Sequence, residues 1–392
     1  MARRRDILFC EGPGDIVASY LTWKRGADFT KETSVTFSGQ FFEFCRLDHL
    51  TFHAISYCPR AETVIDDIGT VANLPRRDVR LPKIGYEITV FLYAVRLLLL
   101  ALRVRPRIIF VTSGVTDWAY LWILRLSGAD VIPILHNTLW PEGFRPKRGV
   151  RQTIHGLVWR HWVRSTLAVS PACARQVHAI AGPVPVTVFK PSFPAASFVE
   201  ATPNDVAVTP FRVMFAGRME ENKGVFDVLE MAKRLPHVEF SLCGEGHALA
   251  EVKRQIDARR LTNVNAHGKL DRMNLLDRYR EAHVVIVPTR STFEEGFAMV
   301  VAEAILLLRP VISNPVVPAA EVLQGAVVSV CTDDVETYVA AIAELSGSAP
   351  NGIYARLVAN ASALRSFILD DSTSLHEMLR ATGKLVLADK AP

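Results

Sequence analysis

Short apolar runs with strand character recur along the chain, separated by stretches of helical length. They occupy residues 7–10, 50–56, 108–111, 131–135 and 167–170 in the first half, and 213–216, 239–243, 284–288 and 310–313 in the second. Continuous Val, Ile and Leu runs between helices are typical of parallel strands that are buried on both faces of a sheet. Two such series predict an α/β protein with two doubly wound, Rossmann-like domains.

Proline marks the boundary between the two series. A dense group of prolines resists both helix and central strand and suits a linker between domains. Its members are Pro183, Pro185, Pro191, Pro194, Pro203 and Pro210. We expect an N-terminal domain at 1–195 and a C-terminal domain at 196–372, with a final helix at about 373–392 that packs back on the first domain.

Charge is divided unevenly between these halves. The chain carries a net charge of +5, yet residues 1–199 have an excess of 10 basic side chains and the remainder an excess of 5 acidic ones. A basic half indicates an anionic partner, which can be nucleic acid, anionic lipid or a phosphorylated substrate. Because no nucleic-acid-binding motif accompanies the charges, we expect no nucleic acid. Six cysteines without CxxC spacing predict reduced thiols in a cytoplasmic protein and no metal site.

The most apolar stretch of the chain is 84–102, which contains Glu87 and Arg96 and is flanked by basic residues. It predicts a buried helix that leads into the strand at 108–111. Two alternatives remain open. A helix can dip its apolar face into lipid headgroups while its arginines bind anionic lipid, or a helix of this length can span a membrane.

A pair of cations follows the first strand of the second half. The segment Gly217–Gly224 carries Arg218 and Lys223 in a glycine-bounded turn between a strand and a helix. Such a turn places backbone N–H groups at the carboxyl edge of a sheet, which suits a phosphate. Arg supplies a planar fork and Lys a mobile point charge, so the pair suits a diphosphate whose negative charge grows as it leaves.

Two glutamates bracket the turn after the strand at 284–288. Glu295 and Glu303 stand on either side of the start of an apolar helix. Carboxylates accept hydrogen bonds from vicinal hydroxyls, so both side chains can hold a ribose or a sugar if they point into a cleft. The alternative is that Glu295 caps the helix and Glu303 lies on its solvated face.

In this order and spacing, these segments resemble the nucleotide-sugar half of GT-B retaining glycosyltransferases of family four, also called group 1. Glu295 and Glu303 match the family's E-x7-E pattern, and Arg218 with Lys223 matches its diphosphate-binding pair. The resemblance covers residues 211–325. It assigns further donor-side positions to Gly217, Gly244, Gly246, Lys269, Leu270, Gly296, Phe297, Ala298 and Met299. Ala298 departs from the glycine that the family usually has, which puts the identity of the donor sugar in doubt.

The first half matches the family more loosely. Gly12-Pro13-Gly14-Asp15 stands where the family places a glycine-rich loop, and His136 resembles a histidine that faces the transferred sugar. Ser113 and Asp117 follow another strand end. We therefore expect the acceptor side to include Gly12, Gly14, Asp15, Ser113, Asp117 and His136.

The resemblance implies a GT-B fold with two domains facing across a cleft. It implies a hexosyltransferase-like enzyme that moves a sugar, with retention, from a nucleotide diphosphate sugar to a hydroxyl of a glycan or polyprenyl-diphosphate-linked acceptor. The expected catalytic residues are Glu295, His136, Arg218 and Lys223, with Glu303 on the ribose. We expect no cofactor and no metal, because the two cations can neutralise the diphosphate.

Such an enzyme fits bacterial surface polysaccharide synthesis in the cytoplasm. It would be peripheral on the inner face of the plasma membrane if residues 84–102 contact lipid. Alternatives within the fold are a phosphorylase, a nucleotide-sugar epimerase and a non-catalytic nucleotide-sugar-binding protein. A dinucleotide-dependent oxidoreductase is disfavoured, since Gly244-x-Gly246 lacks the full G-x-G-x-x-G pattern.

Overall fold

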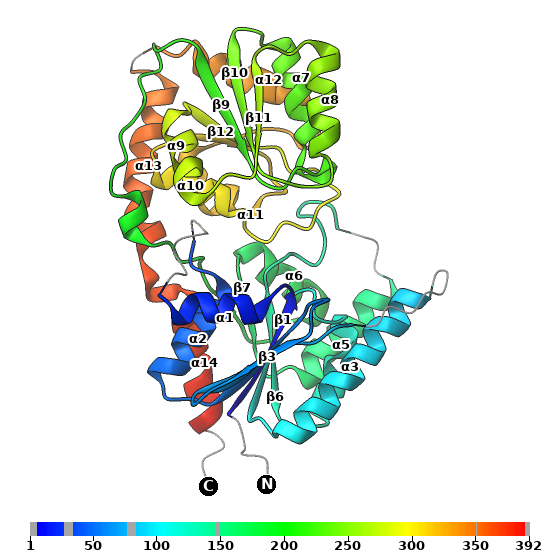
Figure 1. The fold of residues 1–392 in the computed structure, drawn as a ribbon. Helices are drawn as coiled ribbons and strands as arrows, with labels where there is room; N and C mark the ends of the chain where they lie inside the picture. Colours follow the sequence, from blue (N-terminus) through cyan, green and yellow to red (C-terminus); the bar gives the residue numbers. More distant parts are fainter. Residues whose placement is uncertain (1–5, 27–33, 77–83, 146–148, 350, 389–392) are drawn as a thin grey trace.

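The chain forms two α/β domains stacked one on the other in the computed structural model (Figure 1). The structure describes residues 6–26, 34–76, 84–145, 149–349 and 351–388. Within these residues, one sheet has the strand order β3-β4-β2-β1-β5-β6-β7-β8 and the other the order β11-β10-β9-β12-β13-β14. Neighbouring strands are parallel except for the β3–β4 pair. The predicted fold class, two doubly wound domains, is confirmed.

The first domain contains the larger sheet. Its strands are β1 (Ile7–Pro13), β2 (Phe52–Tyr57), β3 (Glu62–Ile65), β4 (Gly69–Asn73), β5 (Ile108–Thr112), β6 (Asp130–Leu135), β7 (Thr166–Ala168) and β8 (Val186–Val188). Its helices are α1 (Ile16–Lys24), α2 (Phe37–Leu47), α3 (Gly85–Val104), α4 (Leu121–Arg125), α5 (Val150–Trp162) and α6 (Pro171–Ala181), with a 3-10 turn η1 (Trp118–Tyr120).

The second domain follows a short 3-10 turn, η2 (Ala195–Phe198). Its strands are β9 (Phe211–Ala216), β10 (Val238–Cys243), β11 (Val264–Gly268), β12 (Val284–Val287), β13 (Val311–Ser313) and β14 (Val327–Ser329). Its helices are α7 (Val225–Arg234), α8 (Leu249–Arg259), α9 (Arg272–Glu281), α10 (Met299–Leu306), α11 (Pro318–Val322), α12 (Val335–Ser346) and α13 (Ile353–Leu369), with 3-10 turns η3 (Glu221–Lys223), η4 (Gln324–Ala326) and η5 (Asp371–Thr373).

Each sheet has a point where the strand order reverses. β1 lies between β2 and β5, and β9 lies between β10 and β12. These central strands are almost wholly buried, because their Val, Ile, Leu and Phe side chains fill both faces of the sheet. In open α/β sheets, ligands bind beyond the carboxyl ends of the strands at such a reversal. The loops that follow β1 and β9 are therefore expected to form the ligand-binding site.

The last helix, α14 (Leu375–Ala388), returns to the first domain and packs beside α2 (Figure 1). The Nε atom of Arg380 lies 3.2 Å from a carboxylate oxygen of Asp48. Before that helix begins, Ser192 Oγ donates a hydrogen bond of 2.6 Å to Asp371. The chain thus crosses between the domains twice, once before β9 and once after α13.

Helix α3 contains the most apolar stretch of the sequence. One face is buried through Val90, Tyr93, Leu97 and Ala101, and the chain leaves the helix at Arg105, which has a left-handed φ of 54°. Its opposite face exposes Tyr86, Phe91, Leu92, Leu99 and Leu102. Among the described residues, no helix is long and apolar enough to cross a membrane.

Candidate active site

The loop that follows β9 is held by tight backbone packing against the end of β12. Gly224 has a left-handed φ of 74°, and a Cβ atom there would lie 2.1 Å from the carbonyl oxygen of Pro288. Any larger residue would push the loop away from the sheet. The glycine therefore fixes Arg218 and Lys223 at the strand-order reversal of the second domain.

The turn that follows β10 supports the same loop from its other side. A Cβ atom on Gly244 would lie 1.8 Å from the carbonyl oxygen of Gly217, and one on Gly246 would lie 2.5 Å from that of Met219. Met219 N also donates a hydrogen bond of 2.9 Å to Glu245 O. Gly244 and Gly246 thus serve, in this structure, to let the two loops pack backbone against backbone.

Lys223 and Glu295 form an ion pair at the carboxyl edge of the second sheet. Lys223 Nζ donates a hydrogen bond to Glu295 Oε2, and Thr289 Oγ1 donates a second one of 3.3 Å to the same oxygen. The Lys223 ammonium also lies 3.9 Å from the centroid of the Phe293 ring. Both charged side chains are largely buried, with 16% and 11% of their surface exposed. The structure therefore brings together two predicted site residues, Lys223 and Glu295, the first glutamate of the E-x7-E pattern.

Arg218 lies nearby but faces solvent. Its side chain is 56% exposed and its guanidinium pairs with Glu220 at 3.0 Å. The same guanidinium lies 5.3 Å from the centroid of Phe293, so the ring is shared with Lys223. An exposed guanidinium of this kind is available to an anionic group that enters the loop.

Glu303 lies in α10 with its side chain buried. The hydroxyl of Tyr279 in α9 donates a hydrogen bond of 2.7 Å to Glu303 Oε2. The helix is preceded by Ala298, whose φ of 71° is left-handed, and Phe297 O accepts a hydrogen bond from Ala319 N at 3.0 Å. The turn between the two glutamates is thus fixed at both ends, and Met299 begins the helix.

The segment after β11 contributes the remaining predicted donor-side residues. Lys269 pairs with Glu245 at 2.8 Å, and both side chains are exposed. Leu270 is partly buried against the core. This segment therefore lies beside the turn that follows β10.

The two domains touch at the predicted site. A Cβ atom on Gly296 would lie 1.7 Å from the carbonyl oxygen of His136 and 3.2 Å from Asn137 Cα. A second link joins α6 to α11, where the guanidinium of Arg175 pairs with Glu321 at 2.6 Å. Figure 1 shows α11 on the side of the second domain that faces the first. The structure therefore brings the backbone of the first predicted glutamate's loop against the predicted histidine.

A cavity of about 360 Å³ lies at the carboxyl edge of the first sheet. Five of the six predicted acceptor-side residues line it: Gly12, Gly14, Asp15, Ser113 and His136. Asp15 also caps α1 by accepting from Ala18 N at 2.9 Å and receives a hydrogen bond from Asn73 at 2.8 Å, and these bonds lower its pKa. Its carboxylate is therefore ionised and oriented.

His136 is held as a neutral imidazole. Its ring stacks on Phe37 with centroids 4.1 Å apart, and Nε2 is buried with no hydrogen-bond partner among the described residues. Burial lowers the pKa of His136 to about 3. The imidazole can exchange a hydrogen bond with a ligand, but it does not bring a positive charge to the site near neutral pH.

Glu11 also lines this cavity and was not predicted. Desolvation in this half-buried position raises its pKa to about 7, against an opposing hydrogen bond from Ser38. The sequence offered one signal, an acidic residue at the end of an otherwise apolar strand.

Asp117 lies in a neighbouring cavity of about 460 Å³, which shares Gly114 with the first. Its carboxylate accepts hydrogen bonds from Arg151, from His155 Nε2 at 2.8 Å and from Ala119 N at 2.8 Å. Burial raises the pKa of Asp117, but the hydrogen bonds and the cationic partners outweigh it and hold the pKa below its ordinary value. Asp117 therefore positions Arg151 and His155 with its own oxygens occupied.

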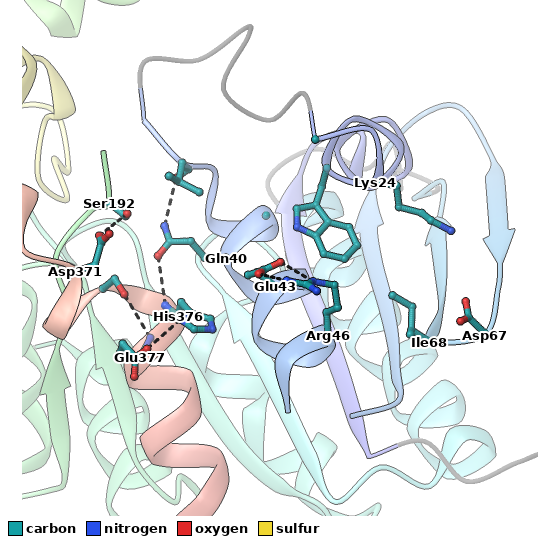
Figure 2. A pocket seen from close by; sticks show the side chains of 15 residues that line it. Lys24, Gln40, Glu43, Arg46, Asp67, Ile68, Ser192, Asp371, His376 and Glu377 are labelled. Atoms are coloured by element: carbon teal, nitrogen blue, oxygen red, sulfur yellow. Dashed lines mark hydrogen bonds and ion pairs between the residues drawn. The ribbon is translucent and has the colours of Figure 1, made fainter. Parts of the chain in front are cut away.

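A larger cavity, of about 770 Å³, lies elsewhere in the described part of the chain (Figure 2). It is formed by α1, α2 and the start of α14, and none of the predicted site residues lines it. Several of its charged side chains pair among themselves or with near neighbours, such as Glu43 with Arg46 at 2.5 Å and His376 with Glu377 at 3.3 Å. Within the described part of the chain, no group of three or more His, Cys, Asp or Glu side chains is arranged to hold a metal ion.

Comparison with known proteins identifies the second domain. Residues 200–362 match the family model described as glycosyl transferases group 1. The second domain is a group 1 glycosyltransferase domain. With the two-domain architecture, this match makes the chain a glycosyltransferase of the GT-B fold. A search of curated proteins finds no match to the chain.

Solved structures of the same fold span the whole glycosyltransferase. HepE from Anabaena, in complex with UDP, has a TM-score of 0.65 and 16% identity, covering 96% of this chain and 99% of its own. Sucrose-phosphate synthase from Thermosynechococcus elongatus has a TM-score of 0.72 and 14% identity, covering 99% and 100%. A UDP-forming α,α-trehalose-phosphate synthase from Burkholderia vietnamiensis has a TM-score of 0.69 and 15% identity, covering 99% of both chains.

Proposed function

We propose that this glycosyltransferase moves a sugar from a nucleotide diphosphate sugar to an acceptor hydroxyl with retention of anomeric configuration. The observation that carries the proposal is the Lys223–Glu295 pair, whose loop packs through Gly296 on the backbone of His136. In the reaction, the bond between the anomeric carbon and the diphosphate breaks, and the acceptor oxygen forms the new bond on the same face. The acceptor proton passes to the leaving diphosphate, so the products are a glycoside and a nucleoside diphosphate.

Each residue has one task in this scheme. Lys223 and the exposed Arg218 neutralise the charge that develops on the leaving diphosphate, which makes a metal ion unnecessary. Glu295 holds hydroxyls of the donor sugar, Glu303 holds the ribose and His136 hydrogen-bonds the transferred sugar. Contact between the two domains excludes water and thereby limits hydrolysis of the donor.

UDP is the nucleoside diphosphate to test first, because HepE was solved with UDP and the trehalose-phosphate synthase is UDP-forming. UDP-, GDP-, ADP- and dTDP-sugars are compared by thermal shift, since a ligand that binds the folded state raises its melting temperature. NMR of the product then reports the anomeric configuration. Inversion would contradict the retaining mechanism, and loss of activity with a chelator that magnesium restores would contradict metal independence.

We also propose that the acceptor is a lipid-linked glycan of bacterial surface polysaccharide, reached at the inner face of the plasma membrane. The support is an apolar face on α3, α4 and α5, which exposes Tyr86, Phe91, Leu92, Leu99, Leu102, Trp122, Leu126, Val150, Ile154, Leu157 and Trp162. Helices that combine exposed apolar side chains with arginines bind anionic bilayer surfaces. Flotation with vesicles of phosphatidylglycerol tests this, and absence of binding at low salt would overturn it.

A further inference from the structure

The cavity of about 460 Å³ in the first domain has features of a ligand site that go beyond the donor residues. Its volume lies within the range of small-molecule sites, about 300–1,000 Å³. It opens between the loops that follow β5 and β6, and Gly114 joins it to the cavity that contains His136. Glu294, the neighbour of Glu295, closes it from the second domain. A ligand seated here would lie next to the proposed transfer point.

Two residues that line this cavity carry buried hydroxyls without partners among the described residues. Thr116 is 9% exposed and Thr138 is 2% exposed, and the Oγ1 atom of each finds no hydrogen-bond partner among the described residues. A buried polar group without a partner costs about 1–3 kcal/mol, so such groups are ordinarily satisfied by a ligand or by water. Two of them in one cavity indicate a ligand that carries several hydroxyls.

The rest of the cavity wall fits the same kind of ligand. Trp118 and Trp140 provide flat apolar surfaces, and Arg151 and Glu294 provide one cation and one carboxylate. Arg151 is held in place by Asp117. Aromatic faces with a few placed polar groups are typical of sites that bind a sugar ring.

Part of the exposed lining of the cavity is apolar. Tyr86 and Phe144 line the cavity beside the exposed Arg151, and they are 64% and 47% exposed. Val150 and Ile154, at the start of α5, flank the cavity residues Arg151 and His155 in the sequence and are 78% and 41% exposed. A sugar seated inside would therefore leave its aglycone against apolar side chains that continue onto the face formed by α3 and α5.

We propose that this cavity is the acceptor site and that it takes an amphiphilic glycoside. The sugar ring lies among Thr116, Thr138 and Trp140, and the apolar chain leaves across Tyr86 and Phe144. This inference rests on the proposed function and names the acceptor class for it.

The test measures binding to the UDP-saturated protein by calorimetry. Octyl and methyl glycosides of glucose, galactose, mannose and N-acetylglucosamine are compared, below the concentration at which the octyl compounds form micelles. At least one octyl glycoside should bind ten-fold or more tightly than its methyl counterpart. Thr138→Val should weaken both about five- to ten-fold, and Thr138→Ser, which keeps the hydroxyl, should restore binding.

Phe144→Ser should abolish the difference between octyl and methyl glycosides. Phe367→Ser is the matched control, because Phe367 is exposed to a similar degree on α13 and lies neither in the cavity nor on the face formed by α3 and α5. If UDP binds and no glycoside does, or if Phe144→Ser and Phe367→Ser have equal effects, the acceptor site is wrong. If UDP and the other nucleoside diphosphates fail to bind, the proposed function itself fails.

Discussion

Gly296 of the second domain packs directly on the backbone of His136 in the first. The space between them is too small for a side chain, since a Cβ atom at residue 296 would lie 1.7 Å from the carbonyl oxygen of His136. This contact places the loop that carries Glu295 beside the cavity that His136 lines. The two domains can therefore approach this closely only because residue 296 is a glycine and has no side chain.

Gly296→Ala should separate the domains at this point while leaving the donor loop folded. A displacement of about 1 Å at a reacting centre can cost about 100-fold in rate. We expect kcat/KM to fall by about that factor, with UDP affinity changed less than about three-fold. Gly325→Ala is the control, because a Cβ atom there meets nothing closer than 3.7 Å. Equal losses in both variants would show that the contact does not position the site.

Lys223→Met tests the cation beside Glu295. Removing one donor that stabilises developing charge in a transition state costs about 100- to 1,000-fold in kcat. We expect a loss of that size, and a weaker affinity for UDP measured by calorimetry. Lys233→Met changes an exposed lysine at the end of the following helix, α7, and should leave both quantities unchanged. Full activity in Lys223→Met would remove this lysine from the mechanism.

Tyr279→Phe tests the support of Glu303. Hydrogen bonds to charged groups contribute about 1.5–3 kcal/mol, so the variant should lose about 2 kcal/mol of unfolding free energy in urea titrations. It should also raise the KM for the donor, because Glu303 would lose the hydroxyl that orients it. Tyr338→Phe removes another buried hydroxyl of the same domain, bonded to Asn314 and Val287, and should affect stability alone. A donor KM that rises equally in both variants would contradict a specific role for Glu303.

The pH dependence of stability should report Glu11. Its pKa in the folded state is about 7, above its ordinary value of 4.5, so the folded state binds a proton that the unfolded chain releases first. Stability is therefore lost as the pH rises from about 4.5 to 7, by up to about 3 kcal/mol. Glu11→Gln should abolish this loss, so that the variant is more stable than the parent at pH 8 and not at pH 4. Urea titrations at the two pH values measure the difference, and a constant difference would contradict a raised pKa.

Much of the architecture follows from the sequence. The buried runs at β1, β5, β9 and β12 were predicted because a central parallel strand needs apolar side chains on both faces. The strands β3, β4, β8, β11 and β14 were not predicted. They are short, and several lie toward the sheet edges with polar or exposed residues, so they lack a continuous apolar signal. β8 even lies among the linker prolines, which an edge strand tolerates.

The residues of the site also fall into a part that the sequence predicts and a part that it does not. The charged donor-side residues could be predicted, because their side chains carry the chemistry and their spacing resembles group 1 glycosyltransferases. The comparisons confirm that family. Thr116 and Thr138 are common residues, and their interest comes from burial without a partner, which no spacing in the sequence reveals. The packing of Gly296 on His136 depends on how two domains meet, and this too is visible only in three dimensions.

Ala298→Gly tests the one position where the chain departs from the family's usual glycine. Ala298 has a φ of 71°, where an L residue with a Cβ atom costs about 1–2 kcal/mol. Glycine removes that strain but adds freedom to the unfolded chain, which costs about 0.4–1 kcal/mol. The net expectation is a gain of about 0.5–1 kcal/mol in unfolding free energy.

The matched control is Ala302→Gly in the helix that follows. Ala302 has no left-handed backbone to relieve, so glycine there should cost about 1 kcal/mol or more. Urea titrations of the two variants should therefore move in opposite directions. Affinity for UDP-sugars, measured on the same samples, shows whether the methyl group of Ala298 also limits the donor. A loss of stability in Ala298→Gly would show that the left-handed turn is not strained. The alanine would then be explained only by how its methyl group affects the fit of the donor.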